Sequence, residues 1–311
     1  MLVTGIVIPV LTLVVIFLFG VQKFSKQINQ AAGEGFKRLL GQVTATPLRG
    51  VALGALFTAA IQSSTATTII LIALVDKSVL SFASSLGVIL GANIGTTITS
   101  QLVAFHVTNI APYFVLIGFL VTYFGRSYKH LGKPIFYFGL IFFSLSLIAL
   151  YIEPVKEAPE LLALFSNITS IYSAIAVGLI FTAIIQSSSV TSGLVVLLVG
   201  AGLLNLEQAI GVMFGANIGT TATALLASFP LSYKARRVAT AHFLFNVLGV
   251  LCFLPFVGAF IALVRSLGGT TTQVVANAHV IFNLISAGVF LLVLRPFETL
   301  VTKVVPAREV E

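Results

Sequence analysis

The feature that most constrains this chain is an internal duplication. Residues 54–68, GALFTAAIQSSTATT, align without a gap on residues 178–192, GLIFTAIIQSSSVTS, at an offset of 124 positions. The match continues from LGVILGANIGTTITSQLVAF at 86–105 to IGVMFGANIGTTATALLASF at 210–229. Roughly half of the positions in the first copy are identical to their counterparts, which chance does not produce even between two apolar stretches. The fold must therefore contain two copies of one structural unit.

Composition places both copies in a membrane. Of the 311 residues, 58% are hydrophobic and 8% are charged, and the mean hydropathy is +1.10, far from the values of soluble domains. The apolar runs have the length of membrane helices and not the alternating pattern of a β-barrel, so we predict an all-α, polytopic membrane protein. The first twenty residues lack a basic segment and a cleavage site, and are interpreted as a span and not as a signal peptide.

Length and flanking charges predict seven full spans, near residues 2–21, 80–105, 110–125, 134–152, 206–229, 238–262 and 274–294. Two further apolar segments, at about 47–76 and 172–203, are each interrupted near the middle by QSST or QSSS. Their halves are too short to cross a hydrocarbon core of about 30 Å, so we predict a re-entrant helical hairpin in each segment.

Basic residues predict the orientation. With the N-terminus outside and the C-terminus cytoplasmic, fifteen of the 17 Lys and Arg residues fall on the cytoplasmic side, as expected for an inner-membrane protein. The first copy crosses an odd number of times, so the second copy must insert upside down, as in inverted-topology transporters. The predicted organisation is a first inverted repeat at 1–125, a second inverted repeat at 126–264, and an additional transmembrane helix with a short cytoplasmic tail at 265–311.

Each predicted hairpin tip carries four consecutive polar residues, at Gln62, Ser63, Ser64 and Thr65, and at Gln186, Ser187, Ser188 and Ser189. The helix entering a tip directs its last carbonyls toward it, and the helix leaving presents unpaired N–H groups, so one end suits a cation and the other an anion. Because the hairpins enter from opposite faces, the tips should meet near the midplane, where hydroxyls and amides can hold an oxyanion such as phosphate.

The GANIGTT segments at 91–97 and 215–221 fall in the middle of predicted spans. If their glycines let the helix unwind, the neighbouring oxygens suit a small hard cation, and sodium is the natural candidate. All nine acidic residues lie in loops or near span ends, so no mid-membrane carboxylate offers a proton relay. The predicted sodium ligands are Gln62, Ser64, Asn93, Thr96, Thr97, Gln186, Ser188, Asn217, Thr220 and Thr221. The glycines also have the G-x-x-x-G spacing of close helix packing, and the sequence leaves both roles open.

Other polar features are interpreted as structural. The motif A-H-x-x-F-N occurs twice, and its His and Asn share one helix face at His242 with Asn246 and at His279 with Asn283, which favours interhelical hydrogen bonds. Arg236 is interpreted with the next arginine as an orientation signal, the alternative being attraction of anions. The basic loops lack the interleaved aromatic residues of a nucleic-acid surface, so no nucleic-acid partner is expected.

At these motifs the chain resembles the type II sodium/phosphate cotransporter family, whose repeated QSSS signatures are followed by G-[AS]-N-I-G-T in the same order. The second copy, with QSSSVTS, GANIGTTATALLASF and AHFLFN, is the closer match. The resemblance implies a sodium-driven importer of inorganic phosphate, with substrate and ions at the tips. The family's functional residues carry over to Gln62, Ser63, Ser64, Asn93, Gln186, Ser187, Ser188, Ser189 and Asn217, whereas Thr65 replaces a family serine.

The resemblance leaves some properties open. Electrogenic animal members have an aspartate after the first N-I-G-T, where this chain has residues 106–109, HVTN, so the sodium stoichiometry is undecided. The chain is expected to be a bacterial member without the appended cytoplasmic helical domain, and a homodimer is neither required nor excluded. The alternatives are a sodium-coupled carrier of sulfate or a neutral amino acid, and a passive anion channel. An enzyme is not expected, because no serine lies in a G-x-S-x-G elbow.

Overall fold

The computed structural model describes residues 2–43 and 46–307, and within these ranges it contains helices and no strands, which confirms the all-α prediction. Residue 1 and the last four residues of the predicted tail lie outside the described residues. The α-helices are α1 (Leu2–Val43), α2 (Pro47–Ile61), α3 (Ser64–Asp76), α4 (Phe82–Thr96), α5 (Ile98–Ala104), α6 (Ala111–Phe124), α7 (Lys129–Ile152), α8 (Pro159–Ser166), α9 (Ile171–Ile185), α10 (Ser188–Gly200), α11 (Leu206–Gly219), α12 (Ala222–Ser228), α13 (Tyr233–Phe253), α14 (Val257–Ser266), α15 (Thr271–Leu292) and α16 (Leu294–Val304). Short 3-10 helices lie at Val107–Ile110, Arg126–Tyr128, Glu153–Val155 and Leu254–Phe256.

Within the described ranges, seven helical segments are long and apolar enough to cross a membrane. Each overlaps one of the seven predicted spans, so the protein is a multi-pass membrane protein. The segments are Gly5–Ala31, Phe82–Ala104, Val107–Phe124, Arg126–Val155, Leu206–Ser228, Tyr233–Ser266 and Thr271–Leu292.

Helix α1 continues well beyond the predicted end of the first span. Its second half is mostly polar, but it keeps apolar side chains on one face. Phe36 stacks on Phe57 of α2, with ring centroids 3.4 Å apart and planes 3° apart, and Leu40 is fully buried. The predicted end of the first span at residue 21 therefore falls inside a continuous helix, whose later turns pack on α2.

The two interrupted segments each fold as a pair of short helices, α2 with α3 and α9 with α10. Both breaks lie at the polar motif. Gln62 and Gln186 adopt left-handed backbone conformations, with φ of 57° and 61°, and these end the first helix of each pair. The next residues, Ser63 and Ser187, have extended backbones and cap the second helix by accepting a hydrogen bond from the N–H three residues on. The motif thus encodes a helix stop followed directly by a helix start.

The GANIGTT glycines serve close packing. Helix α4 lies along α2, and α11 lies along α9. A Cβ placed on Gly91 would collide with the carbonyl oxygen of Val51, and one placed on Gly215 would collide with that of Ile175. Only glycine permits backbones to approach this closely, so the packing alternative is the correct one for these residues.

The expectation that the glycines unwind the span is therefore wrong. Helix α4 is continuous through Asn93 and ends at Thr96, and the turn that separates it from α5 is at Thr97. In the second copy the turn comprises Thr220 and Thr221, between α11 and α12. The interruption thus lies at the threonines that end the motif, where side-chain oxygens are available.

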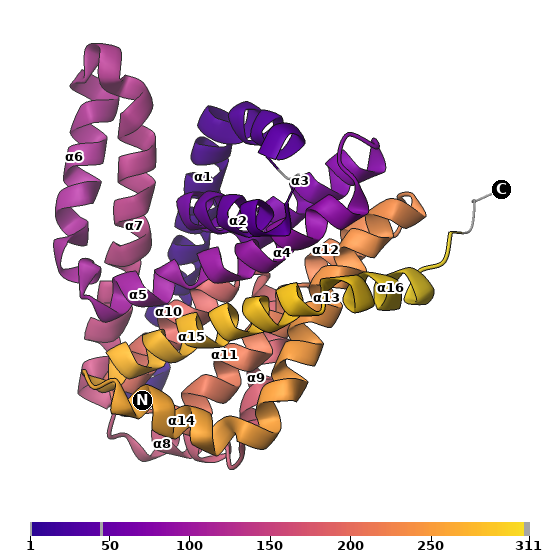
Figure 1. The fold of residues 1–311 in the computed structure, drawn as a ribbon. Coiled ribbons are helices and arrows are strands. Elements are labelled where there is room, and N and C mark those ends of the chain that lie inside the picture. Colours follow the sequence, from indigo (N-terminus) through magenta and orange to yellow (C-terminus); the bar gives the residue numbers. More distant parts are fainter. Residues whose placement is uncertain (1, 44–45, 308–311) are drawn as a thin grey trace.

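Two helices that follow the duplicated segments, α13 and α15, contact both copies. Helix α13 packs on α3 and α4 of the first copy and on α11 and α12 of the second, and α15 packs on α4, α5, α10 and α11. Helices α6 and α7 form a long pair at one side of the molecule, and α15 crosses the middle (Figure 1). Together α13 and α15 therefore contact the second helix of each pair and the interrupted span of each copy.

Candidate substrate and ion site

The structure brings the two polar tips into contact. The Ser189 hydroxyl, in the first turn of α10, donates to the backbone carbonyl of Gln62 at the end of α2, at 3.3 Å. The Thr65 hydroxyl, in the first turn of α3, lies 3.3 Å from that of Thr220, in the turn after α11. The tip of the first pair therefore touches both the tip and the interrupted span of the second copy.

The start of each second helix offers unpaired donors. Ser64 and Ser188 are the first residues of α3 and α10, and both side chains are buried. Within the described residues neither hydroxyl makes a hydrogen bond. No residue from 62 to 68 or from 186 to 192 is charged. Each tip thus presents helix N–H groups and hydroxyls in a buried, uncharged setting, which suits an anion.

A hydrogen-bonded pair of threonines links the two helices at each tip. Thr58 and Thr67 are hydrogen-bonded at 2.8 Å between α2 and α3, and Thr182 and Thr191 are hydrogen-bonded at 2.7 Å between α9 and α10. All four side chains are buried. These threonines are not among the predicted site residues, although the pairs recur at the offset of 124 and could have been found by comparing the polar residues of the two copies.

The two tips differ at equivalent residues. In the first copy the buried Gln62 side chain accepts a hydrogen bond from the Thr99 hydroxyl of α5. Their counterparts in the second copy are Gln186 and Thr223. Gln186 is exposed, and the Thr223 hydroxyl is buried without a partner in the described part of the chain. The contact between the tip and the interrupted span is thus formed in one copy and open in the other.

Most of the predicted sodium ligands of the GANIGTT segments donate to their own helix and leave oxygen lone pairs available. Asn93 donates its side-chain N–H to Ile89 at 3.0 Å, and Thr96, Thr97 and Thr221 donate to carbonyls three or four residues earlier at 2.7–3.0 Å. Their side chains are buried. A hydroxyl that donates in this way keeps its lone pairs directed elsewhere, which is compatible with a cation ligand.

The second A-H-x-x-F-N motif holds one predicted ligand directly. His279 Nε2 lies 3.4 Å from the Asn217 side-chain oxygen, and its Nδ1 lies 2.9 Å from the Ser100 hydroxyl. Asn217 also donates to the Asn283 side-chain oxygen at 3.4 Å. The prediction of interhelical hydrogen bonds is confirmed, and these contacts join α15 to α5 and α11.

The first A-H-x-x-F-N motif is less completely bonded. His242 Nδ1 lies 3.1 Å from the Thr68 hydroxyl of α3, so this histidine also joins two helices. Its Nε2 and the side-chain oxygen of Asn246 are buried without partners among the described residues. The same motif therefore has one bonded and one partly unbonded copy, as the glutamines of the tips do.

Comparison with known families decides the membership of the chain. The family model described as Na+/Pi-cotransporter matches residues 16–149 and 158–294, which include both tips and both GANIGTT segments. The chain belongs to this family. The resemblance inferred from the motifs is thereby confirmed. No solved structure is significantly similar to the chain.

This Na+/Pi-cotransporter family member is similar to several known proteins. It is 33% identical to the uncharacterized protein YqeW of Bacillus subtilis over 306 residues, 97% of this chain and 99% of that protein. It is 30% identical to the putative inorganic phosphate export protein YjbB of Escherichia coli K12 over 244 residues, 77% of this chain but 44% of that protein. Over 108 residues, 33% of this chain and 18% of the relative, it is 42% identical to the rat sodium-dependent phosphate transport protein 2C.

Proposed function

We propose that this protein is a sodium-coupled carrier that imports inorganic phosphate across the cell inner membrane and binds it between the two tips. The observation that carries the proposal is the buried contact of the two uncharged, serine-rich tips through the Ser189 hydroxyl and the Gln62 carbonyl. The membership in the Na+/Pi-cotransporter family favours phosphate over sulfate or an amino acid.

Phosphate would lie at the N-terminal ends of α3 and α10. The hydroxyls of Ser64 and Ser188 and the first N–H groups of each helix would donate to it, with the other tip residues Gln62, Ser63, Thr65, Gln186, Ser187 and Ser189 around them. A helix N-terminus carries the equivalent of about half an elementary positive charge, so two of them offset only part of the charge of phosphate. Neutral donors therefore bind the anion but do not neutralise it.

Sodium would supply the missing positive charge. The carbonyl ends of α2 and α9 lie at the same tips, and the threonine turns add hydroxyl oxygens, which are the hard ligands that a small cation prefers. The proposed ligands are those predicted from the sequence, at Gln62, Ser64, Asn93, Thr96, Thr97, Gln186, Ser188, Asn217, Thr220 and Thr221. Bound sodium and bound phosphate would thus stabilise each other at a place where an unaccompanied ion is strongly disfavoured.

Transport would exchange the roles of the two copies. In this proposal residues 1–125 and 126–264 are inverted repeats with re-entrant hairpins, and residues from 265 add a helix that both copies contact. The Gln62–Thr99 contact is closed and the Gln186–Thr223 contact is open, as expected if each copy alternates between two arrangements. Closing the second contact while opening the first would move access from one face of the membrane to the other.

A second candidate is export of phosphate from the cell. It is favoured by the names of the Salmonella typhimurium and Escherichia coli YjbB relatives, which are 29% and 30% identical to this chain. A carrier works in the direction that its gradients set, so the same site could serve either direction.

The experiment that tests the proposal is flux in proteoliposomes that contain the purified protein. Phosphate uptake should follow an inward sodium gradient and disappear when potassium replaces sodium. Sodium-independent efflux from phosphate-loaded vesicles would instead favour export, and unsaturable flux in both salts would favour a channel.

A further inference from the structure

One cavity among the described residues lies away from the tips. It has a volume of about 390 Å³ and lies between the end of α12, the start of α13 and the segment that follows α16. Its lining residues are Leu225, Ser228, Phe229, Tyr233, Arg236, Thr240, Val304, Val305 and Pro306. The turn at Thr220–Thr221 precedes α12, and the cavity is lined by the second half of that helix, from Leu225 on. We call it the Arg236 cavity.

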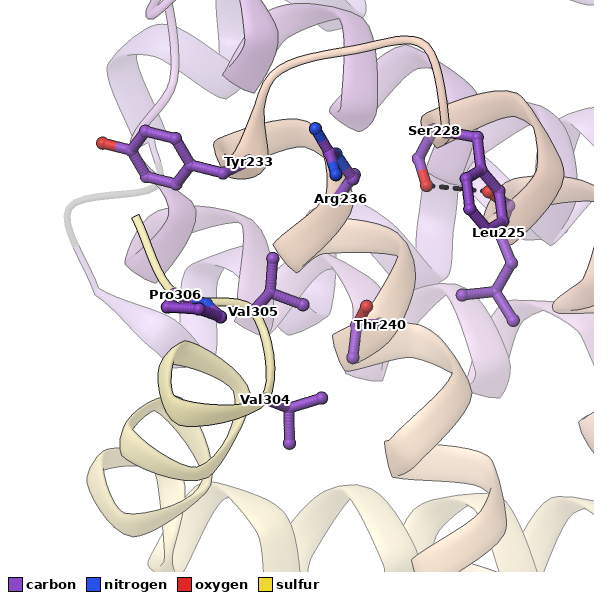
Figure 2. A pocket seen from close by; sticks show the side chains of 9 residues that line it. Leu225, Ser228, Tyr233, Arg236, Thr240, Val304, Val305 and Pro306 are labelled. Atoms are coloured by element: carbon purple, nitrogen blue, oxygen red, sulfur yellow. Dashed lines mark hydrogen bonds between the residues drawn. The ribbon is translucent and has the colours of Figure 1, made fainter. Parts of the chain in front are cut away.

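Among the described residues that line this cavity, Arg236 alone is charged. Its side chain stands between Tyr233 and Ser228, and Thr240 lies one helical turn further along α13 (Figure 2). The Arg236 Nε donates to the Leu231 carbonyl at 3.1 Å, which holds the guanidinium at the edge of the cavity and leaves its terminal NH₂ groups without an acidic partner among the described residues. A half-buried guanidinium of this kind is a preferred donor for phosphate oxygens.

Neighbouring contacts keep the cavity in this form. Arg237 donates through Nε to the Val305 carbonyl at 2.9 Å, and its guanidinium lies over the Tyr233 ring at 4.9 Å. These contacts hold the segment after α16 against α13 and thereby fix the wall of the cavity that lies opposite α12. Asp76, which contacts the start of α13, accepts from the Ser232 N–H and does not line the cavity.

The first copy has a cavity of different character, and apart from α5 its walls do not correspond to those of the Arg236 cavity. A cavity of about 210 Å³ lies at the end of α5, the counterpart of α12, and its lining includes Glu153 and His106 and neither Lys nor Arg. Glu153 is paired there with Lys156 at 2.8 Å. Arg236 has no basic counterpart in the first copy, where the residue 124 positions earlier is Pro112.

We propose that the Arg236 cavity binds a phosphate group at the membrane face that is predicted to be cytoplasmic. Arg236 donates to the phosphate oxygens, and the Thr240 hydroxyl, which makes no hydrogen bond within the described chain, is a second donor. The group belongs either to inorganic phosphate or to the headgroup of an anionic phospholipid, since both present the same oxygens at this face. This site is separate from the tips and does not depend on sodium.

The test uses the full chain in nanodiscs with 3-fluorotyrosine at position 233, so that the ¹⁹F resonance reports on this cavity and not on the tips. One titration adds inorganic phosphate to phosphatidylcholine nanodiscs at constant ionic strength. The other replaces phosphatidylcholine stepwise by phosphatidylglycerol without phosphate. A saturable shift in the first identifies the free anion, and a shift only in the second identifies the lipid.

Arg236→Gln should weaken the effective ligand about tenfold or more, because it removes hydrogen bonds to a charged group. The matched control Lys234→Gln removes the same charge from an exposed side chain outside the cavity and should change the affinity less than twofold. Thr240→Val, which retains the shape of the threonine, should also weaken binding of the ligand. It is the test variant to use if Arg236→Gln does not fold. The proposal is overturned if neither ligand shifts the resonance, or if Arg236→Gln and Lys234→Gln have equal effects.

Discussion

The contact between Gln62 and Thr99 yields the sharpest prediction, because its counterpart in the second copy is open. Thr99→Val keeps the shape of the side chain and removes the hydroxyl that donates to the buried glutamine. Leaving a buried acceptor unsatisfied costs about 1–3 kcal/mol, which corresponds to a population shift of about 5- to 150-fold toward the arrangement in which Gln62 is exposed.

Thr223→Val is the matched opposite change. The Thr223 hydroxyl is buried without a partner among the described residues, so its removal should stabilise the described arrangement. In the alternate arrangement the same hydroxyl would bond to Gln186, and the valine would remove that bond. The two variants should therefore shift the equilibrium in opposite directions by similar amounts.

The assay is the alkylation rate of single cysteines at the equivalent positions Ala59 and Ala183, one turn before each glutamine, in a chain whose native Cys252 is replaced by serine. Thr99→Val should raise the ratio of the rate at 59 to the rate at 183, and Thr223→Val should lower it. If both variants move the ratio in the same direction, or neither moves it, the two contacts do not alternate and the account of access is wrong.

Three further predictions concern the tips, the packing and the topology. Ser64→Ala and Ser188→Ala should each weaken phosphate binding by about 1.5–3 kcal/mol, measured by isothermal titration. His242→Ala should mainly lower thermal stability, measured by melting curves. Unchanged phosphate binding in both serine variants would remove these residues from the site. Gly215→Ala should lower the free energy of unfolding by about 1–3 kcal/mol because its Cβ meets the Ile175 carbonyl, whereas Gly288→Ala, with nothing within 4 Å, should not. Cysteines near Lys129 and Glu157 should label from opposite sides of the membrane, and labelling from one side would contradict the orientation.

Much of the fold could be predicted because the motifs encode local structure. The breaks at Gln62 and Gln186 coincide with the polar motif, since a left-handed glutamine followed by a capping serine ends one helix and starts the next. The spans followed from the length of the apolar runs and their flanking charges. The role of the glycines could not be predicted, because the sequence pattern does not distinguish a glycine that unwinds a helix from one that lets two backbones touch, as Gly91 does.

The difference between the two tips could not be predicted, for a physical reason. The motifs around Gln62 and Gln186 are almost identical, so the sequence assigns both the same environment. Which copy closes depends on the packing of the whole chain, including the unequal contacts of α13 and α15 with the two halves. The Arg236 cavity could not be predicted either, because one of its walls comes from residues near the C-terminus that are distant in sequence from α12 and α13.

The proposed mechanism requires sodium and phosphate to bind interdependently at the tips. The direct measurement is equilibrium binding of phosphate to the purified protein across a range of sodium concentrations, with choline or potassium holding the ionic strength constant. Because the tip residues carry no charge, the account predicts a coupling of about 1–3 kcal/mol, or about 5- to 150-fold tighter phosphate binding at saturating sodium. Linkage requires that phosphate tighten sodium binding by the same factor. Equal phosphate affinity in sodium, potassium and choline would contradict the claim.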